Sequence, residues 1–389
     1  MSVAAATRER WAMSVEARAL VLVTATLVVF GLATLYSASA IVAIQDDRES
    51  WYFLARQAMG VMVGMALFAA AAKIDAEGLH RLAWPLMIVT VVLMTVIVLP
   101  FTQAIAPRIN GSRRFLFGAA LQPSELGKLA VVVWTSMLLV KKGDQMRRLT
   151  KGLLPFLVVI GVLDVLAILE PDLSVAMMYT LVMGIILFTG GVRVGHFVAL
   201  GIIALPLLWS QLMKLQYALE RILSFMHADA SSPVVSYQLK QSLIAVGAGG
   251  LFGRGFGNGR QQYGFVPLGY NDFIGSTVGE EWGFVGMLFL VGVFALYGWL
   301  GMRIARQART PFLQLVAVGL TVTMVITAFL HIGVVIGLLP TTGLTLPFVS
   351  YGRTNLLLSF VITGILVNIG SQKERVVAEH ATNPLTAPA

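Results

Sequence analysis

Long apolar runs separated by short polar stretches dominate the chain. Most runs approach the ~20 residues that a helix needs to cross a hydrocarbon core of ~30 Å. The pattern therefore predicts an all-α integral membrane protein, built as a single polytopic domain over residues 1–389. About ten transmembrane helices are expected, at 19–40, 54–73, 80–101, 121–140, 152–169, 172–190, 194–212, 273–302, 312–338 and 346–370.

Polar tails at 1–18 and 371–389 and a long polar interval at 213–272 lie outside these spans. An even number of spans places both tails on one side of the membrane. Basic residues gather in the segments on that side, so the positive-inside rule predicts cytoplasmic termini and a large extracytoplasmic loop at 213–272. They are Arg8, Arg10, Arg18, Lys141, Lys142, Arg147, Arg148, Lys151, Arg193, Arg303, Arg306, Arg309, Lys373 and Arg375.

Composition agrees with the pattern and excludes some chemistry. Hydrophobic residues make up 57% of the chain and charged residues only 12%. The chain has no cysteine, which excludes disulfides, thiol catalysis and cysteine-ligated metals. Its net charge of +9 is accounted for by the basic loops beside the spans, so we expect no nucleic-acid partner.

The first polar stretch with possible chemistry reads RINGSRRFLFGAALQPSELGKLA. Gln122 and Glu125 stand in a Q-P-S-E run that is typical of a helix N-terminus. This explanation does not cover Lys128, one turn inside the span, or Arg113 and Arg114, which lie on the outer side against the charge rule. Outward arginines suit an anionic ligand such as a phosphate, which they bind in a bidentate way.

The second stretch reads GAGGLFGRGFGNGRQQYGFVPLGYNDFIGSTVGEEWG. Its glycine run lacks the strand-turn-helix context of a dinucleotide site, so we expect an irregular loop. Asp272 lies at the outer mouth of the eighth expected span, and Glu280 and Glu281 lie about two turns further in. Acids inside a span are costly, so at least one should face a polar cavity or a cation.

The third stretch reads LLPTTGLTLPFVSYGRTNLLLSF. Prolines and a glycine interrupt an apolar region, and broken backbone at membrane depth is tolerated only against protein or a wet cavity. Ser350 and Arg353 line the entry of the last expected span. His331, alone on an apolar face of the span before it, is expected to be a hydrogen-bonded packing residue.

These stretches together resemble the SEDS family, the shape, elongation, division and sporulation proteins. The motifs are QPSELGKLA, EPDLS, YQLKQSLIAVGAGGLFGRGFGNGRQ, NDFIGSTVGEEWGFVG and LPTTGLTLPFVSYG, which follow the family order through nearly the whole chain. GFGNGRQ and TTGLTLPFVSYG are more similar to division and sporulation members than to elongation members. The resemblance implies a fold of ten transmembrane helices of the GT-C glycosyltransferase type.

The resemblance also implies a function. The activity would be polymerisation of lipid II, a disaccharide-pentapeptide on undecaprenyl diphosphate, during septal wall synthesis at the inner membrane. The partners would be a class B penicillin-binding protein and other divisome proteins, and a divalent cation, Mg²⁺ or Mn²⁺, would assist without a recognisable motif. The residues expected to bind substrate are Arg113, Arg114, Gln122, Glu125, Lys128, Asp272, Glu280, Ser350 and Arg353.

The chain departs from the family at the expected catalytic aspartate. The family carries this residue in a D-P-x-G-x-G-Y-Q run, and here the corresponding stretch reads MHADASSPVVSYQ. Counting back from the shared Tyr-Gln places the family aspartate on Ser231. The nearest acid is Asp229, which is the expected general base; Asp272 and Glu220 are alternatives.

Two other departures and two other functions remain open. EPD replaces the common QPD, and SYGRTN replaces the usual SYGGSS, which adds the cation of Arg353. A lipid II flippase would keep paired ionisable groups near the midplane of several spans, whereas this chain concentrates its polar residues toward the outer face. A catalytically weak scaffold that recruits the penicillin-binding protein is the second alternative, because the family aspartate is missing.

Overall fold

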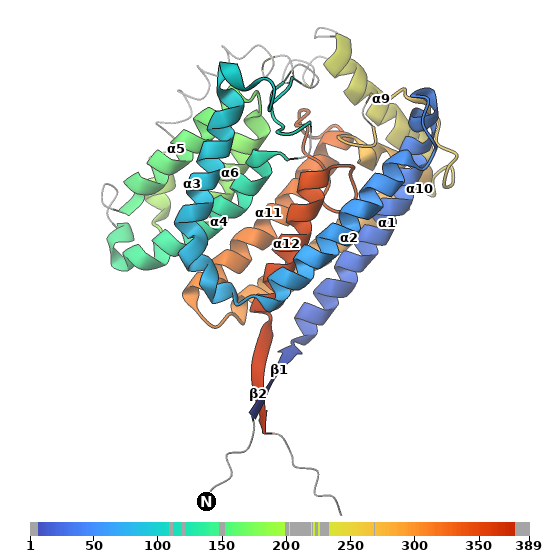
Figure 1. The fold of residues 1–389 in the computed structure, drawn as a ribbon. Coiled ribbons are helices and arrows are strands. Elements are labelled where there is room, and N and C mark those ends of the chain that lie inside the picture. Colours follow the sequence, from blue (N-terminus) through green and yellow to red (C-terminus); the bar gives the residue numbers. More distant parts are fainter. Residues whose placement is uncertain are drawn as a thin grey trace, which may run out of the picture.

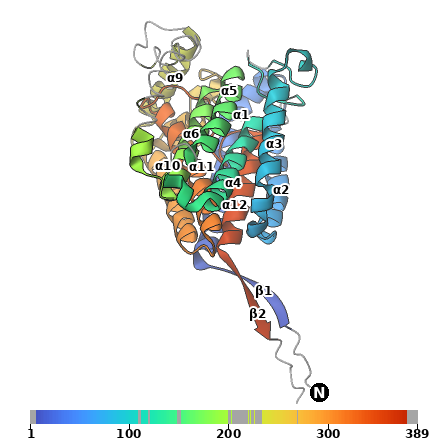
Figure 2. The ribbon, with the colours of Figure 1, turned by 90° about the vertical axis from the view of Figure 1, so that its left-hand side faces the viewer.

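The helices run side by side along one direction and leave two extended tails at one end (Figures 1 and 2). The computed structural model describes residues 7–108, 112–118, 121–147, 152–198, 233–267 and 269–377, and single residues at 202, 219, 221 and 225. We call the end with the tails the tail end of the bundle and the opposite end the loop end.

The elements of the described residues are almost all helical. The helices are α1 (Val15–Gln45), α2 (Tyr52–Lys73), α3 (Leu79–Val98), α4 (Pro123–Lys142), α5 (Leu154–Leu169), α6 (Leu173–Thr189), α9 (Pro233–Gly249), α10 (Ile274–Arg306), α11 (Pro311–Val335) and α12 (Arg353–Ile369). Short 3₁₀ turns are η1 (Ala76–Gly78), η2 (Pro100–Thr102), η3 (Gly143–Arg147) and η5 (Gln261–Tyr263), and the strands are β1 (Thr7–Met13) and β2 (Ser371–Val377).

Several helices begin where the sequence supplies a cap. Ser14 accepts a hydrogen bond from Ala17 N at the start of α1, at 3.1 Å. Asp172 accepts one from Val175 N at the start of α6, at 3.3 Å. These side chains satisfy backbone donors that have no partner inside the helix. Helix α4 instead begins with Pro123, whose missing N–H costs nothing at that position.

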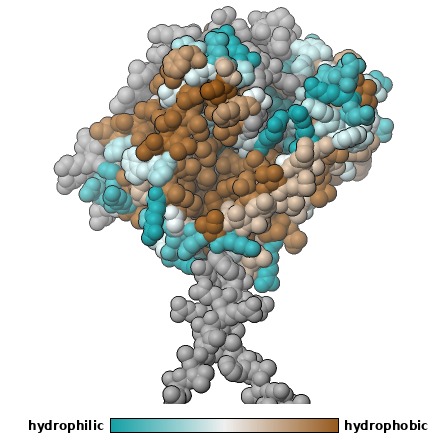
Figure 3. Space-filling view, viewed as in Figure 1, coloured by the Kyte–Doolittle hydropathy of each residue, from teal (hydrophilic) through white to brown (hydrophobic). Residues whose placement is uncertain are grey.

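Helices α4 and α11 form the centre of the bundle. In each of them 78% of the apolar window is buried inside the protein, compared with 22% for α2. Helix α2 packs mainly on α12, and α3 packs on α4. One face of the molecule shows an apolar band with hydrophilic residues gathered near both ends (Figure 3). This arrangement is that of a membrane protein whose outer helices contact lipid.

The predicted spans agree with the observed helices, with three differences. Among the described residues, six helices are long and apolar enough to cross a membrane, and α5, α6 and α12 are shorter apolar helices. The expected span at 194–212 lies mostly outside the described residues. Helix α9 occupies part of the expected loop at 213–272, and α12 begins at Arg353 instead of 346 because the segment before it is not helical.

The two ends of the described chain pair with each other. Strands β1 and β2 are antiparallel, with Thr7 opposite Val377 and Met13 opposite Ser371. They lie together at the tail end (Figure 1). An even number of spans would place both ends on one side of the membrane, which this pairing agrees with, and the compartment that the tail end faces stays a prediction.

Helix α10 is broken at Gly283, where φ is 65° and ψ is −157°. This backbone region is essentially restricted to glycine. A break leaves backbone groups without partners in the helix, and such groups are costly inside a membrane. The loop after α9 satisfies them: Phe284 N donates to Gly250 O, Val285 N to Leu251 O, Arg254 N to Glu280 O and Gly255 N to Glu281 O, at 2.9–3.1 Å. We call residues 250–261 the glycine clasp.

Candidate functional site at the loop end

Arg114 joins the loop before α4 to the turn between α5 and α6. Its Nε donates to Glu170 O at 3.2 Å, and its Nη1 lies 3.4 Å from Asp172 Oδ2. Its Nη2 also donates to Pro171 O. The guanidinium therefore holds the E-P-D turn through two backbone carbonyls and one carboxylate, a fork-like use that a lysine cannot reproduce.

Two further charges reach the same place. Asp272, just before α10, feels the charges of Arg114 and Arg221. Arg221 donates through Nη1 to Thr342 O at 3.3 Å, and the same oxygen accepts a hydrogen bond from Ser174 Oγ at 2.7 Å. We call the following set the charged cluster: Arg114, Glu170, Asp172, Arg221 and Asp272.

Burial decides the protonation of the acids in this cluster. Burial, helped by the charge of the neighbouring Asp172 and opposed by that of Arg114, raises the pKa of Glu170 to about 9. Burial also raises the pKa of Asp172 in spite of Arg114, the Val175 N–H and other cations. The pKa of Asp272 rises to about 6 for the same reason, although two arginines lower it. Glu170 is thus held mostly protonated near neutral pH, as carboxyls in poorly solvated surroundings are, whereas Asp272 stays mostly ionised.

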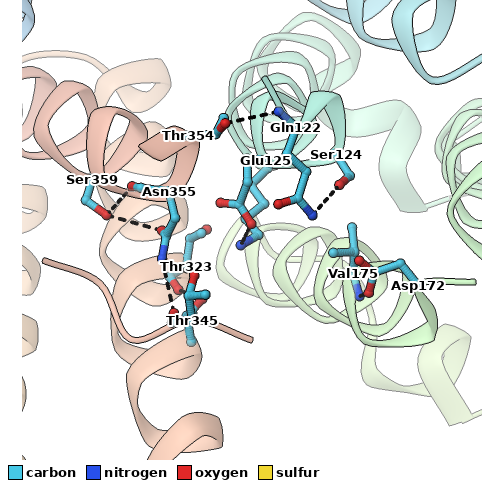
Figure 4. Close-up of polar contacts among 12 residues, drawn as sticks. Gln122, Ser124, Glu125, Asp172, Val175, Thr323, Thr345, Thr354, Asn355 and Ser359 are labelled. Atoms are coloured by element: carbon cyan, nitrogen blue, oxygen red, sulfur yellow. Dashed lines mark hydrogen bonds and ion pairs between the residues drawn. The ribbon is translucent and has the colours of Figure 1, made fainter. Parts of the chain in front are cut away.

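A buried ion pair lies beside the cluster in the first turns of α4. Lys128 Nζ donates to Glu125 Oε1 at 2.7 Å, and both side chains are almost fully buried. Figure 4 shows Glu125 of this pair between Asp172, at the start of α6, and Asn355 of α12. The charge of Lys128 also lowers the pKa of Asp172. The pair therefore belongs to the electrostatic surroundings of the charged cluster.

The N-terminal ends of α4, α6 and α12 meet at this place. Gln122 N, which precedes α4, donates to Thr354 Oγ1 in α12 at 3.0 Å. Tyr179 Oη in α6 donates to Ser124 O in α4 at 2.6 Å. Each N-terminus carries a partial positive charge and backbone donors without helical partners. Arg114 contacts the start of α6 at Asp172, and these bonds join the starts of α4 and α12 to that helix, so the region favours an anionic ligand.

The broken segment before α12 is held by its own polar residues. Ser350 Oγ accepts a hydrogen bond from Leu346 N at 2.9 Å, and Ser350 O accepts one from Gln57 Nε2 at 3.1 Å. Asn355 Nδ2 donates to Thr345 O at 3.1 Å (Figure 4). Arg353 opens the helix and is partly exposed. Protein groups thus satisfy this non-helical backbone, as was expected from its prolines.

Arg113 has different surroundings from its neighbour Arg114. Its Nε donates to Ala106 O at 3.1 Å, its Nη1 to Leu99 O at 3.0 Å and its Nη2 to Thr102 Oγ1 at 3.0 Å. All three contacts lie within the connection between α3 and α4. Arg113 therefore stabilises the conformation of this loop. A contact of Arg113 with substrate stays a prediction.

Glu280 and Glu281 hold the glycine clasp. Glu280 Oε1 accepts a hydrogen bond from Arg260 N at 2.8 Å and its Oε2 accepts one from Gln261 N at 3.1 Å, while Arg254 lies 3.9 Å away. Glu281 accepts a hydrogen bond from Ser37 Oγ in α1. The expected cation and polar surroundings are therefore present at Glu280. A role for Glu280 in substrate binding stays a prediction.

His331 is confirmed as a packing residue, because it bonds to two backbone groups. Its Nδ1 lies 2.8 Å from Leu344 O, and its Nε2 accepts a hydrogen bond from Gly275 N at 3.4 Å. The expected base Asp229, the alternative Glu220 and Ser231 all lie outside the described residues. Their roles stay predictions.

A metal site is not evident in the part of the chain that the structure describes. No group of three or more His, Asp or Glu side chains there could hold a metal ion. Asp172 and Asp272 instead face arginines. The described residues therefore do not fit a resident divalent cation, and Mg²⁺ or Mn²⁺ stays a prediction.

Sequence reasoning missed the parts of the site that depend on distant segments. The sequence marks Glu170 and Asp172 only as part of a family motif and a departure from it, and it gives no signal for Arg221. Two acids around a proline between apolar spans were a usable signal, because such acids need a partner. Nothing in the sequence pairs that turn with Arg114, which is 56 residues away from Glu170.

Comparisons with known proteins agree with this architecture. The family model for FtsW, RodA and SpoVE, described as "Cell cycle protein", matches residues 17–375. A protein of Trichlorobacter lovleyi named "Probable peptidoglycan glycosyltransferase FtsW" is 36% identical, over 90% of this chain and 92% of that relative. "Stage V sporulation protein E" of Bacillus subtilis is 33% identical, over 90% of this chain and 95% of that relative.

Two solved structures share the fold. One, described as "Structural coordination of polymerization and crosslinking by a peptidoglycan synthase complex", has a TM-score of 0.74 and 25% identity, and covers 92% of this chain and 98% of the solved chain. The rod shape determining protein RodA of Thermus thermophilus has a TM-score of 0.65 and 24% identity, covering 90% and 95% respectively. The SEDS resemblance is thereby confirmed: this multi-span membrane protein belongs to the FtsW/RodA/SpoVE family of cell cycle proteins.

Proposed function

We propose that the protein is a peptidoglycan glycosyltransferase that polymerises lipid II into glycan strands during septal wall synthesis. The observation that carries the proposal is the meeting of the α4, α6 and α12 N-termini beside Arg114 and Lys128. The leaving group of this reaction is a lipid diphosphate, whose negative charge such a region stabilises. The names of the relatives from Trichlorobacter lovleyi and Geobacter sulfurreducens support the activity.

The proposed reaction transfers a sugar between two oxygens. The acceptor hydroxyl oxygen forms a bond to the donor's anomeric carbon, and the bond from that carbon to the diphosphate oxygen breaks. The bonding electron pair leaves with the diphosphate, near Arg114. The hydroxyl proton passes to a carboxylate that acts as general base. Our candidate for this base is Asp229.

Asp272 is the alternative base within the described residues. Its pKa of about 6 leaves it mostly ionised near neutral pH, yet basic enough to accept a proton. It lies close enough to Arg114 and Arg221 to feel both charges. An arginine that stabilises the leaving diphosphate and a nearby carboxylate that takes the proton would form a complete transfer site.

We further propose that the protein works with a class B penicillin-binding protein, together with other divisome proteins, in the inner membrane at the septum. Both termini would face the cytoplasm and the loop end would face outward, where lipid II is consumed. The relative with the solved structure that is described as a peptidoglycan synthase complex supports a partnership of this kind.

The test uses the purified full-length protein with its penicillin-binding partner and lipid II. We expect glycan polymer in the absence of any other synthase, and its loss in Asp229→Ala with partner binding unchanged. Loss in Asp272→Asn, with normal synthesis by Asp229→Ala, would assign the base to Asp272.

Two results would instead favour the other functions. Translocation of lipid II in vesicles without polymer formation would indicate a flippase. Retained partner binding without polymer formation by the unmodified protein would indicate a scaffold.

A further inference from the structure

A second polar region at the loop end is separate in composition from the charged cluster. A cavity of about 220 Å³ lies between the end of α1, residues 261–270 and the first turn of α10. Its polar lining residues are Gln45, Gln261, Gln262, Tyr270, Ser276 and Thr277.

The glutamines of this lining are held in fixed orientations. Gln45 Nε2 donates to Tyr263 O at 3.3 Å, and Gln262 Nε2 donates to Gly257 O at 2.8 Å. Gln261 Nε2 donates to Gln241 Oε1 at 3.2 Å. Each of these hydrogen bonds uses the amide nitrogen of a lining glutamine and does not involve the amide oxygen of the same side chain.

One of these oxygens is a buried acceptor without a partner. Gln261 Oε1 is buried and accepts no hydrogen bond within the described part of the chain. A buried polar group in this state is costly unless a ligand or water supplies a donor. Because this oxygen is closed to solvent, a ligand would have to use the other acceptors of the lining, the amide oxygens of Gln45 and Gln262 and the hydroxyl oxygens of Ser276 and Thr277. These acceptors suit a ligand that is rich in donors, such as hydroxyl and amide N–H groups.

Charge and size narrow the class of ligand. The lining residues that the structure describes carry no charged side chain. An anionic diphosphate or the terminal carboxylate of a peptide would be buried there without a partner, at a high cost. The volume is below the ~300–1,000 Å³ of pockets for drug-sized ligands. A single neutral sugar unit fits the uncharged lining and the small volume better than a charged peptide stem does.

The cavity also adjoins the proposed site of transfer. Tyr270, in its lining, precedes Asp272 of the charged cluster by two residues, and its carbonyl accepts a hydrogen bond from Tyr351 N at 3.1 Å. The Tyr270 ring packs on Phe53, with ring centroids 4.7 Å apart. This segment is thus fixed on both sides, and it connects the cavity directly to the charged cluster.

We infer that this cavity binds a neutral N-acetylated sugar unit of the glycan chain next to the site of glycosyl transfer. The inference rests on the proposed function. Amide oxygens and hydroxyls of the lining would accept hydrogen bonds from the sugar's hydroxyl and acetamido groups, and the unit would position a strand for further addition.

The experiment measures binding without turnover. The probe is a tetrasaccharide of N-acetylglucosamine, in which every unit is neutral, titrated against the full-length protein in detergent and followed by saturation-transfer NMR. The variant combines Gln45→Met with Thr277→Val, which remove polar atoms at similar side-chain size. We expect its Kd to rise about tenfold, the effect of losing one or two hydrogen bonds.

The matched control is Thr26→Val, because Thr26 is an exposed threonine of α1 whose hydroxyl bonds to Leu22 O. Its Kd should equal that of the unmodified protein, and thermal melting should show that both variants are folded. No binding of the tetrasaccharide, equal binding by the double variant, or displacement of the sugar by the free pentapeptide would overturn the inference. Because no turnover is needed, a failure of the glycosyltransferase proposal would leave this result readable.

Discussion

Glu280 in α10 and Glu170 in the charged cluster are both 1% exposed, yet their carboxyl groups have opposite surroundings. Glu280 accepts two backbone hydrogen bonds from the glycine clasp and lies 3.9 Å from Arg254. Neither carboxyl oxygen of Glu170 has a hydrogen-bond partner among the described residues. Arg114 donates a hydrogen bond to the backbone carbonyl of Glu170 and none to the Glu170 carboxyl group.

The difference separates a structural use of acids from a functional one. In the glycine clasp, the backbone groups freed by the break and the carboxylate of Glu280 have matching groups on the loop, so the region stabilises the fold. In the charged cluster, burial outweighs the nearby arginines and raises the pKa of the acids. Groups that cost stability in this way are concentrated at functional sites. The following changes test this contrast.

Gly283→Ala should have the largest effect on stability. A Cβ at this position would lie 2.3 Å from Gly253 N, and φ is 65°. The substitution would therefore open the clasp, and we expect loss of folded protein on size-exclusion chromatography. Gly292→Ala, in the same helix with no atom within 4 Å of its added Cβ, is the matched control and should fold normally. Equal behaviour of the two variants would contradict the role of the clasp.

Glu280→Ala should cause the second-largest loss of stability. It leaves the N–H groups of Arg260 and Gln261 without their acceptor. Each unsatisfied buried donor costs ~1–3 kcal/mol, so a loss of about 3 kcal/mol in unfolding free energy is expected. Thermal melting in detergent measures it, and the exposed Glu49→Ala serves as the control. An unchanged melting temperature for Glu280→Ala would show that the carboxylate does not stabilise the clasp.

Glu170→Gln should stabilise the protein, and increasingly so as pH rises. The folded pKa is raised from 4.5 to about 9, so the folded state binds more protons than the unfolded state between these values. The stability of the unmodified protein then falls with rising pH, by up to ~1.4 kcal/mol per pH unit. Glutamine cannot titrate and removes this slope. Melting temperatures at several pH values between 5 and 9 that run parallel for both proteins would refute the raised pKa.

Asp272→Asn should also stabilise the protein relative to the unmodified chain as pH rises, but over a narrower pH range. Its pKa is raised from 3.8 to about 6, so the corresponding loss of stability lies between these values. Above about pH 6 the difference between Asp272→Asn and the unmodified protein should become constant, whereas that of Glu170→Gln should still grow. The charged groups that act on Asp272 are Arg114, Arg221 and Asp172, and all are retained in this variant.

Much of the fold could be predicted from the sequence, because apolar runs of span length have one low-energy arrangement in a membrane. Helices α1 to α6 and α10 to α12 lie close to the expected spans. Helix α9 was missed, since VVSYQLKQSLIAVGAG mixes polar and apolar residues and was read as part of a loop. Its helical state depends on packing against α10, which no local pattern shows.

The candidate site was predicted only in part. Arg114, Lys128 and Asp272 were identified because charges near spans need a reason, and the structure brings Arg114 and Asp272 together. The different surroundings of Arg113 and Arg114 could not be predicted, because adjacent residues of the same type give the same signal. Only the tertiary contacts to Leu99 and Asp172 separate them.

This pair of arginines provides the most direct test of the central claim, that the charged cluster is the site of glycosyl transfer. Arg113→Lys and Arg114→Lys keep the charge and remove the planar fork. Lipid II polymerisation per folded molecule, measured with the penicillin-binding partner, should fall tenfold or more in Arg114→Lys and stay within about twofold in Arg113→Lys, in line with ~1.4 kcal/mol for each factor of ten. Full activity of Arg114→Lys, or an equal loss in both variants, would contradict the account.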